Sequence, residues 1–289
     1  MKISLPSIHS NYEGFSHLIN LAAATNACWF DDIEIDMSHV TWFDANMCAP
    51  FGAILYKMGC DINTVTLTNS PTSVETILSK NGFLCNYGRP RRLDTHGSTI
   101  EYKRFEPKDD RYFANYIETQ MVGKGIPEMS SGLVKKFRES IYEIFSNAVI
   151  HSQTKLGIFS CGQYFPKKHR MDFSVADLGI GIRQNLHGRL GLDLPAEQAI
   201  NWALEGKNTT KSGPIPGGLG LKLLREFIEL NQGRIQVVSD KGYWELYRGE
   251  VVTKSFSDPF PGTVVNIEIN TADTKSYCLS SEISPDDIF

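Results

Sequence analysis

Short β-rich runs alternate with helix-length amphipathic stretches along the first 95 residues, and this alternation is typical of an α/β unit. Residues 33–37 (Ile-Glu-Ile-Asp-Met) are the clearest strand candidate, and a helix is predicted to follow from Ala45 to Gly59. A second strand is predicted at residues 65–67, followed by a short helix from Val74 to Ser79. The sequence therefore predicts an α/β domain at the N-terminus.

The chain has 289 residues, which at about 150 residues per domain leaves room for a second domain. Turn-forming and basic residues gather between Asn86 and Gly97, and they indicate a linker. We expect one domain over residues 1–92, a second over 98–272, and a peripheral tail over 273–289. Within the second domain the pattern predicts strands at about 100–105, 157–164 and 171–176, and helices at about 110–122 and 131–152.

The composition is that of a folded globular protein, with 41% hydrophobic and 21% charged residues. A net charge of -4 provides no overall positive field, so neither nucleic acid nor an anionic membrane is an expected partner. The cysteines are scattered without a C-x-x-C pair, and no signal peptide or spanning segment is evident, so a cytoplasmic location with reduced thiols is expected. The tryptophans are expected in the core or at partner contacts; they are Trp29, Trp42, Trp202 and Trp244.

The long helix predicted over residues 131–152 carries a polar face. Glu143, Asn147 and His151 are spaced by four and therefore share one side of the helix. A carboxylate can accept a proton from water or a hydroxyl, and an amide oxygen is a hard ligand suited to Mg²⁺. A solvated polar face is the alternative interpretation of the same spacing.

A second motif follows the strand predicted to end at Ala176. Asp177 stands at the strand end, and Gly179 and Gly181 follow it. Glycines allow the backbone to turn close against a flat ligand, and the carboxylate can accept a hydrogen bond from an exocyclic amine such as that of adenine. A dinucleotide-binding fingerprint would need another glycine where Gln184 stands, so the alternative is a simple strand-to-helix turn.

A third motif is a glycine run, Gly217-Gly218-Leu219-Gly220-Leu221, that opens a predicted helix. Unpaired backbone N–H groups at such a helix start favour a phosphate. The run is not a Walker P-loop, because Leu219 and Gly220 occupy the positions of its Lys and Ser/Thr. The preceding residues 182–216 are polar and rich in glycine and proline, and they are predicted to form a loop that closes as a lid over a nucleotide.

The order of these motifs resembles the GHKL superfamily of ATPases, which includes gyrase, large heat-shock chaperones, histidine kinases and mismatch-repair ATPases. The resemblance covers about residues 100–270 and includes Gly262-Thr263 ahead of the strand predicted at 264–269. It implies a Bergerat α/β sandwich that binds ATP and Mg²⁺.

The resemblance also implies roles for individual residues. Asn147 would hold Mg²⁺, Glu143 would be the general base, and Asp177 would bind the adenine amine. The remaining nucleotide contacts would come from Gly179 and Gly181 beside the base, Gly218, Gly220 and Leu221 near the phosphates, and Thr263 in the adenine site.

Within the superfamily, the run from Asn147 to His151 is most similar to the anti-sigma-factor serine kinases. Sensor histidine kinases often carry a lysine where Ile150 stands, and no histidine here is followed by Asp or Glu. A sensor autokinase is therefore not expected.

The N-terminal residues, about 1–90, resemble the STAS fold of anti-anti-sigma factors. In phosphorylatable members a serine follows the aspartate at the strand-to-helix turn, but here Asp44 is followed by Ala45. The resemblance therefore implies a regulatory or docking domain without a phosphoacceptor.

Together these features predict an ATP-binding regulatory protein that hydrolyses Mg-ATP or transfers its γ-phosphate to a protein partner. The partner could itself be a STAS-like or regulatory protein, and the resemblance allows a homodimer. The alternative is a nucleotide-gated interaction switch with negligible turnover.

Overall fold

The computed structural model describes residues 1–205 and 219–282. Its strands are β1 (Lys2–Ser4), β2 (Asp32–Asp36), β3 (Thr64–Thr68), β4 (Thr99–Phe105), β5 (Ile158–Phe165), β6 (Arg170–Asp177), β7 (Arg234–Tyr247) and β8 (Glu250–Asn270). Its α-helices are α1 (Tyr12–Thr25), α2 (Cys48–Cys60), α3 (Thr72–Lys80), α4 (Asp110–Gln120), α5 (Ser131–His151), α6 (Gly181–Leu190), α7 (Ala196–Leu204) and α8 (Leu219–Asn231).

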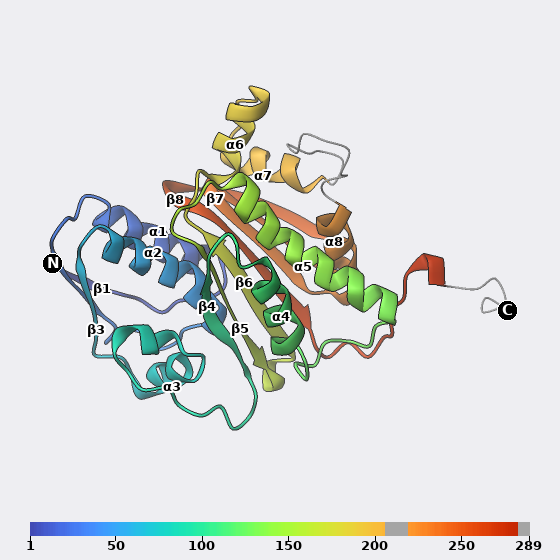
Figure 1. Cartoon of the computed structure of the whole chain (residues 1–289), viewed down its shortest axis with the longest axis horizontal. Helices are drawn as coiled ribbons and strands as arrows, with labels where there is room; N and C mark the ends of the chain where they lie inside the picture. The colour runs from blue at the N-terminus through green and yellow to red at the C-terminus, as the bar shows by residue number, and fades with distance from the viewer. Residues whose placement is uncertain (206–218, 283–289) are drawn as a thin grey trace.

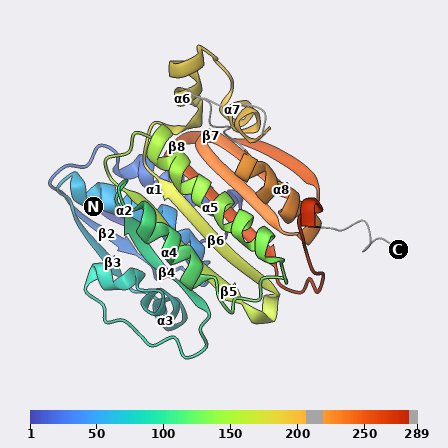
Figure 2. The same cartoon turned by 45° about the vertical axis from the view of Figure 1, so that its right-hand side comes forward.

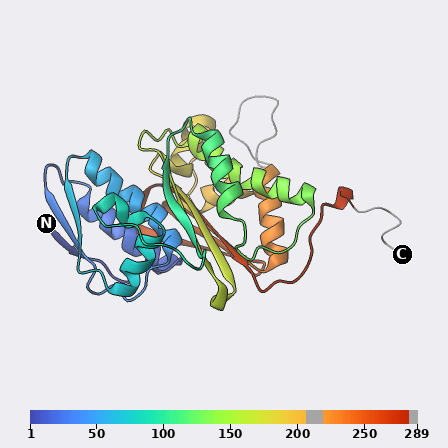
Figure 3. The same ribbon diagram turned by 60° about the horizontal axis from the view of Figure 1, so that its bottom comes forward.

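The described elements form four layers, which Figure 3 shows edge-on. A parallel sheet in the order β1-β2-β3 is the outer layer, and helices α1 and α2 lie beneath it (Figure 1). The second sheet, in the order β4-β5-β6-β8-β7, is antiparallel and packs its near face against α1 and α2. Helices α4, α5 and α8 cover its far face (Figure 2). This arrangement confirms the mixed α/β class expected from the sequence.

The three-stranded sheet buries only one of its faces. In β2, Ile33 and Ile35 are buried against the helices, whereas Glu34 and Asp36 point outward and pair with Lys2. Successive side chains on a strand point to opposite faces, so the alternation in β2 determines which face is covered.

The five-stranded sheet separates two cores. In β6, Phe173 and Val175 pack with the buried faces of α5 and α8, whereas Ala176 packs with α1 and α2. The buried residues of the N-terminal 90 residues therefore share one continuous cluster with residues of the larger sheet, including Phe159 of β5. The contact of α1 and α2 with the five-stranded sheet is therefore part of the hydrophobic core.

Residues 271–282 lie against the start of α5 and the side of α8. Ser130 caps α5 by accepting a hydrogen bond from the Leu133 amide, and the Glu282 carboxylate accepts one from Gly132. Tyr277 packs edge-on against Phe227 of α8. The described part of the predicted tail is thus peripheral in position but attached to two helices.

The main difference from the sequence prediction concerns residues 182–216. Helices α6 and α7 occupy residues 181–190 and 196–204, so the loop expected there is wrong over this stretch. The Asn185 amide donates to the His151 carbonyl at 3.0 Å, and this contact docks α6 onto the end of α5. Residues 206–216 of the predicted lid lie outside the described residues. None of the described helices is long and apolar enough to cross a membrane.

Candidate functional site

A cavity of about 170 Å³ lies between α5, α6, α7, α8 and the adjoining face of the five-stranded sheet. Its wall includes described residues from each of the motifs predicted to bind a nucleotide. Those residues are Glu143, Asn147 and His151 of α5, Asp177 and Gly181 after β6, Leu221 of α8, and Thr263 of β8.

Helix α5 supplies the polar side of the cavity. Its predicted bounds of 131–152 agree with the observed Ser131–His151 to within one residue. The opposite side of the helix is buried in the core through Ile141 and Phe145. The four-residue spacing therefore directs Glu143, Asn147 and His151 to the cavity, as the sequence predicts, while core packing holds the helix in place.

Asp177 is the one buried carboxylate among the described residues that line the cavity. Only 4% of the residue is exposed, and its Oδ1 accepts a hydrogen bond from the Gly179 amide at 2.9 Å. Burial raises the pKa of Asp177 to about 7, against the opposing effects of hydrogen bonds from Gly179 and Ser152. The carboxyl therefore changes charge near neutral pH and is positioned to accept a hydrogen bond from a ligand.

Gly179 and Gly262 are required by the packing of the backbone behind Asp177. A Cβ on Gly179 would lie 2.1 Å from the Ser152 carbonyl oxygen, and one on Gly262 would lie 2.0 Å from the Asp177 carbonyl oxygen. Gly262 also has φ of +153°, which other residues rarely adopt. These glycines allow the end of α5, the turn after β6 and β8 to approach one another. For Gly179 this is a structural reason different from the base contact expected from the resemblance.

Thr263 lies beside Asp177, since the two residues are paired in neighbouring strands. Ser239 of β7 completes this corner of the site. The Ser239 hydroxyl accepts from the Ile182 amide at 2.9 Å, donates to the Gly262 carbonyl at 3.0 Å, and lies 3.0 Å from Thr263 Oγ1. Sequence reasoning missed Ser239, because no motif marks it and its position depends on the pairing of β7 with β8.

Three further residues of the cavity wall had no functional signal in the sequence. Trp244 of β7 is buried with its indole N–H donated to Asn201, and Trp202 of α7 lies in the same wall. Arg225 of α8 lines the cavity and pairs with Glu229 at 3.0 Å. Trp244 agrees with the expected core environment, whereas Trp202 is only half-buried; both belong to the wall of the cavity, and such a wall suits a flat ring.

Of the two glycines predicted to bind phosphate, only Gly220 is among the described residues. Gly218 lies outside the described residues, whereas Gly220 falls in the first turn of α8, and Leu221 lines the cavity. Helix α8 covers Leu219–Asn231, so a helix is present after the glycine run.

Asn147 is the residue of the cavity wall that the sequence analysis expects to hold Mg²⁺. The described residues contain no group of three or more His, Cys, Asp or Glu side chains that could hold a metal ion. Mg²⁺ usually keeps several waters and needs only one or two protein ligands when it also binds substrate phosphates. The amide oxygen of Asn147 can supply one such ligand.

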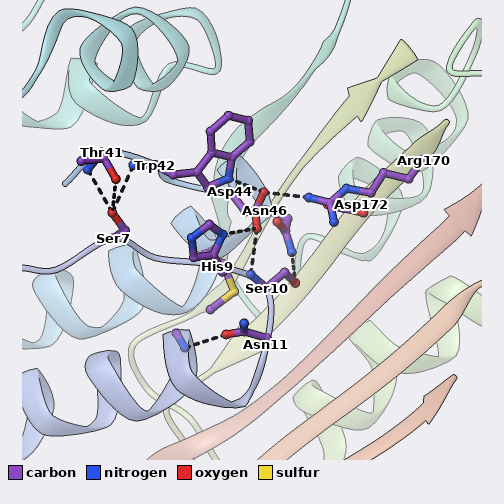
Figure 4. A network of polar contacts seen from close by, with 12 residues as sticks. Ser7, His9, Ser10, Asn11, Thr41, Trp42, Asp44, Asn46, Arg170 and Asp172 are labelled. Atoms are coloured by element: carbon purple, nitrogen blue, oxygen red, sulfur yellow. Dashed lines mark hydrogen bonds and ion pairs between the residues drawn. The ribbon is translucent and has the colours of Figure 1, made fainter. Parts of the chain in front are cut away.

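A second polar cluster lies on the opposite face of the same sheet, between β6 and the N-terminal residues (Figure 4). The Asp44 carboxylate accepts hydrogen bonds from Trp42 Nε1 at 2.8 Å, the Ser10 amide at 2.9 Å and Arg170 Nη2 at 2.8 Å. Arg170 Nη2 also lies 3.2 Å from Asp172 Oδ2. All residues from 43 to 55 are buried, so a partner cannot reach the turn after Asp44 in this structure.

Comparison with known proteins adds no family assignment: no family model matches the chain, and a search of curated proteins gives no match.

Proposed function

We propose that the chain is an ATP-binding regulatory protein of the GHKL class that hydrolyses Mg-ATP or transfers its γ-phosphate to a protein partner. One observation carries this proposal. Glu143, Asp177 and Thr263 are far apart in sequence, yet they line one cavity together with the start of α8. Residues this far apart in sequence meet only through the fold, so their convergence supports a common ligand.

The chemistry of the cavity agrees with an adenine nucleotide. A buried carboxylate that has Gly179 as a backbone donor can accept the exocyclic amine of adenine on its remaining oxygen. Apolar residues such as Val175, Leu186 and Trp244 surround it and can contact the ring faces. This combination of a few polar groups in an apolar wall is typical of small-ligand sites.

The α5 face would act on the phosphate end. Glu143 would accept the proton of a water or a partner's hydroxyl as that oxygen attacks the γ-phosphate. Asn147, one turn away, would hold the magnesium ion, whose positive charge offsets charge on the phosphates. Arg225 adds a cation to the same wall.

The first experiment measures nucleotide binding. Asp177→Asn should weaken binding of Mg-ATP about 100-fold, because a hydrogen bond to a charged group is replaced by a neutral amide. Asp172→Asn is the matched control, since Asp172 is a buried carboxyl of the same strand on the opposite face. Equal binding by wild type and Asp177→Asn, measured calorimetrically, would contradict the proposed site.

The second experiment separates binding from turnover. Glu143→Gln should bind Mg-ATP with unchanged affinity and lose roughly 10²- to 10⁴-fold in turnover, the usual contribution of a general base. Glu139→Gln, one turn earlier on α5 and outside the cavity wall, should turn over like wild type.

With γ-labelled ATP, free phosphate indicates hydrolysis, and label retained on a protein indicates phosphoryl transfer. Binding without either product would favour the nucleotide-gated switch.

A further inference from the structure

An exposed apolar patch occupies one end of the three-stranded sheet. Trp29 and Phe30 lie in the loop before β2, and Ile62 lies in the loop before β3. Their exposed fractions are 59%, 76% and 58%, respectively. We refer to these three residues as the Trp29 patch.

The two loops occupy matching positions. Asp32 pairs with Thr64 where the strands begin, so Phe30 and Ile62 each stand two residues before a paired position. Asn63 is buried and joins the loops: its Oδ1 accepts from the Asp31 amide at 2.9 Å, and its Nδ2 donates to the Cys28 carbonyl at 3.0 Å. The patch is therefore one surface held by a buried amide.

The backbone of the patch is strained. Phe30 has φ of +59° and Ile62 has φ of +62°. A left-handed conformation is unfavourable for any side chain with a Cβ and especially so for β-branched isoleucine. Such strain persists only where the surrounding structure enforces it, and here it holds large apolar side chains in solvent, where they gain no burial.

The charge around the patch is acidic. Asp31 and Asp32 are exposed, and their carboxylates form no ion pair in the described part of the chain. Asp61 is paired with Lys57 at 2.6 Å, and the terminal ammonium donates to the backbone carbonyl of Asp32. Free carboxylates beside exposed aromatic residues repel anionic lipid and nucleic acid and attract lysine and arginine.

We propose that the Trp29 patch is a docking surface for a protein partner that presents an amphipathic segment with apolar and basic side chains. Trp29 and Phe30 supply the apolar anchor, and aromatic residues are frequent at the energetic centre of interfaces. Asp31 and Asp32 supply charge complementarity at the rim. The loops of this surface adjoin the three-stranded sheet, which lies on the opposite side of the five-stranded sheet from α5 and α8 (Figure 3). The proposal does not depend on the function proposed for the cavity.

The test uses two synthetic amphipathic peptides, one of leucine and lysine and the other of leucine and glutamate. The lysine peptide should bind the full chain, and the double variant Trp29→Ala/Phe30→Ala should lose at least about tenfold in affinity. The matched control is Leu93→Ala/Tyr112→Ala, which removes two other large exposed apolar side chains and should bind like wild type. Asp31→Asn/Asp32→Asn should weaken binding and reduce its salt dependence.

Other outcomes overturn the proposal. If both peptides bound equally, or if Trp29→Ala/Phe30→Ala kept the wild-type affinity for the lysine peptide, the Trp29 patch would not be a docking surface of this kind. Binding to phosphatidylserine vesicles that depends on Trp29 would assign it to a lipid surface. Concentration-dependent self-association, lost in the variant, would assign it to a second copy of the chain. Ile62→Gly provides a check on folding, because it relieves the strained φ and should raise Tm.

Discussion

Asp172 and Asp177 are both buried carboxyls of strand β6, but they lie on opposite faces of the sheet. Burial raises the pKa of both. Arg170 opposes this shift at Asp172 through its positive charge, whereas only hydrogen bonds from Gly179 and Ser152 oppose it at Asp177. One carboxyl belongs to an ionic network between two layers, and the other faces a cavity.

The difference shows that a perturbed pKa alone does not identify a functional site. Structural ion-pair networks perturb carboxyl groups as strongly as binding sites do. Two features distinguish Asp177: it lines a cavity, and within the described residues no cationic side chain forms an ion pair with it. A ligand in the cavity can donate a hydrogen bond to Asp177, whereas Asp172 already forms an ion pair with Arg170.

Removing the cation from the network should have the largest effect. Arg170→Met removes the closest ion partner of the buried Asp44 and leaves only His9 at 3.8 Å, so the free energy of unfolding should fall by about 3 kcal/mol. Arg138→Met is the control, because its pair with Glu118 is solvent-exposed and contributes less than about 1 kcal/mol. Urea denaturation measures both, and equal losses would contradict the assignment of a structural role to Arg170.

The charge of Asp177 should appear next in the pH dependence of stability. The pKa of Asp177 is about 7 in the folded chain, above the ordinary value of 3.8. The protonated carboxyl therefore stabilises the folded state at low pH, and this contribution to the free energy of unfolding is lost as pH rises through 7. Asp177→Asn abolishes this titration. The stability of the variant relative to wild type should therefore increase by about 2–3 kcal/mol between pH 5 and pH 8. A difference that is independent of pH would show that Asp177 is ionised throughout.

Nucleotide affinity should depend on the same ionisation. If the carboxylate accepts the adenine amine, wild-type affinity for Mg-ATP should be constant above pH 7 and fall about tenfold per pH unit below it. Calorimetry in buffers of different ionisation enthalpy should also detect proton release on binding at pH 6. The weak residual binding of Asp177→Asn should show no such dependence.

Ser152 offers the smallest and most specific test. Its hydrogen bond lowers the pKa of Asp177, so Ser152→Ala should shift the midpoint of the affinity profile upward by a fraction of a pH unit. The mutation should leave the Asp172 network unchanged, because Ser152 lies on the cavity side of the sheet. A downward shift would contradict the assigned direction of this hydrogen bond.

Local patterns predicted the parts of the fold that local interactions determine. Apolar residues at helical spacing mark α5, and the alternation of Met171, Phe173 and Val175 with other residues marks most of β6. The sequence failed at α6, where glycines and polar residues suggested a loop and the bond from Asn185 to the end of α5 stabilises a helix. It also missed β7, whose pairing with β8 shifts register around Asp240.

The candidate site divides in the same way. Glu143, Asn147 and Asp177 could be selected because helical spacing or a strand end marks them. Ser239 and Arg225 could not, since they reach the cavity only through the pairing of β7 and the packing of α8. The residues that neighbour Ser239 and Arg225 in the sequence give no indication that these two side chains lie at the cavity.

The shared core beneath α1 and α2 has a consequence for synthesis of the chain. Helix α2 ends at Cys60, but β5, against which it packs, begins at Ile158, about 100 residues later. At roughly 5–20 residues per second, the ribosome needs about 5–20 s to deliver that partner. During this interval the apolar faces of α1 and α2 that pack against the five-stranded sheet stay exposed. We therefore expect chaperone protection of the nascent chain to matter most before the cavity between α5, α6, α7 and α8 has formed.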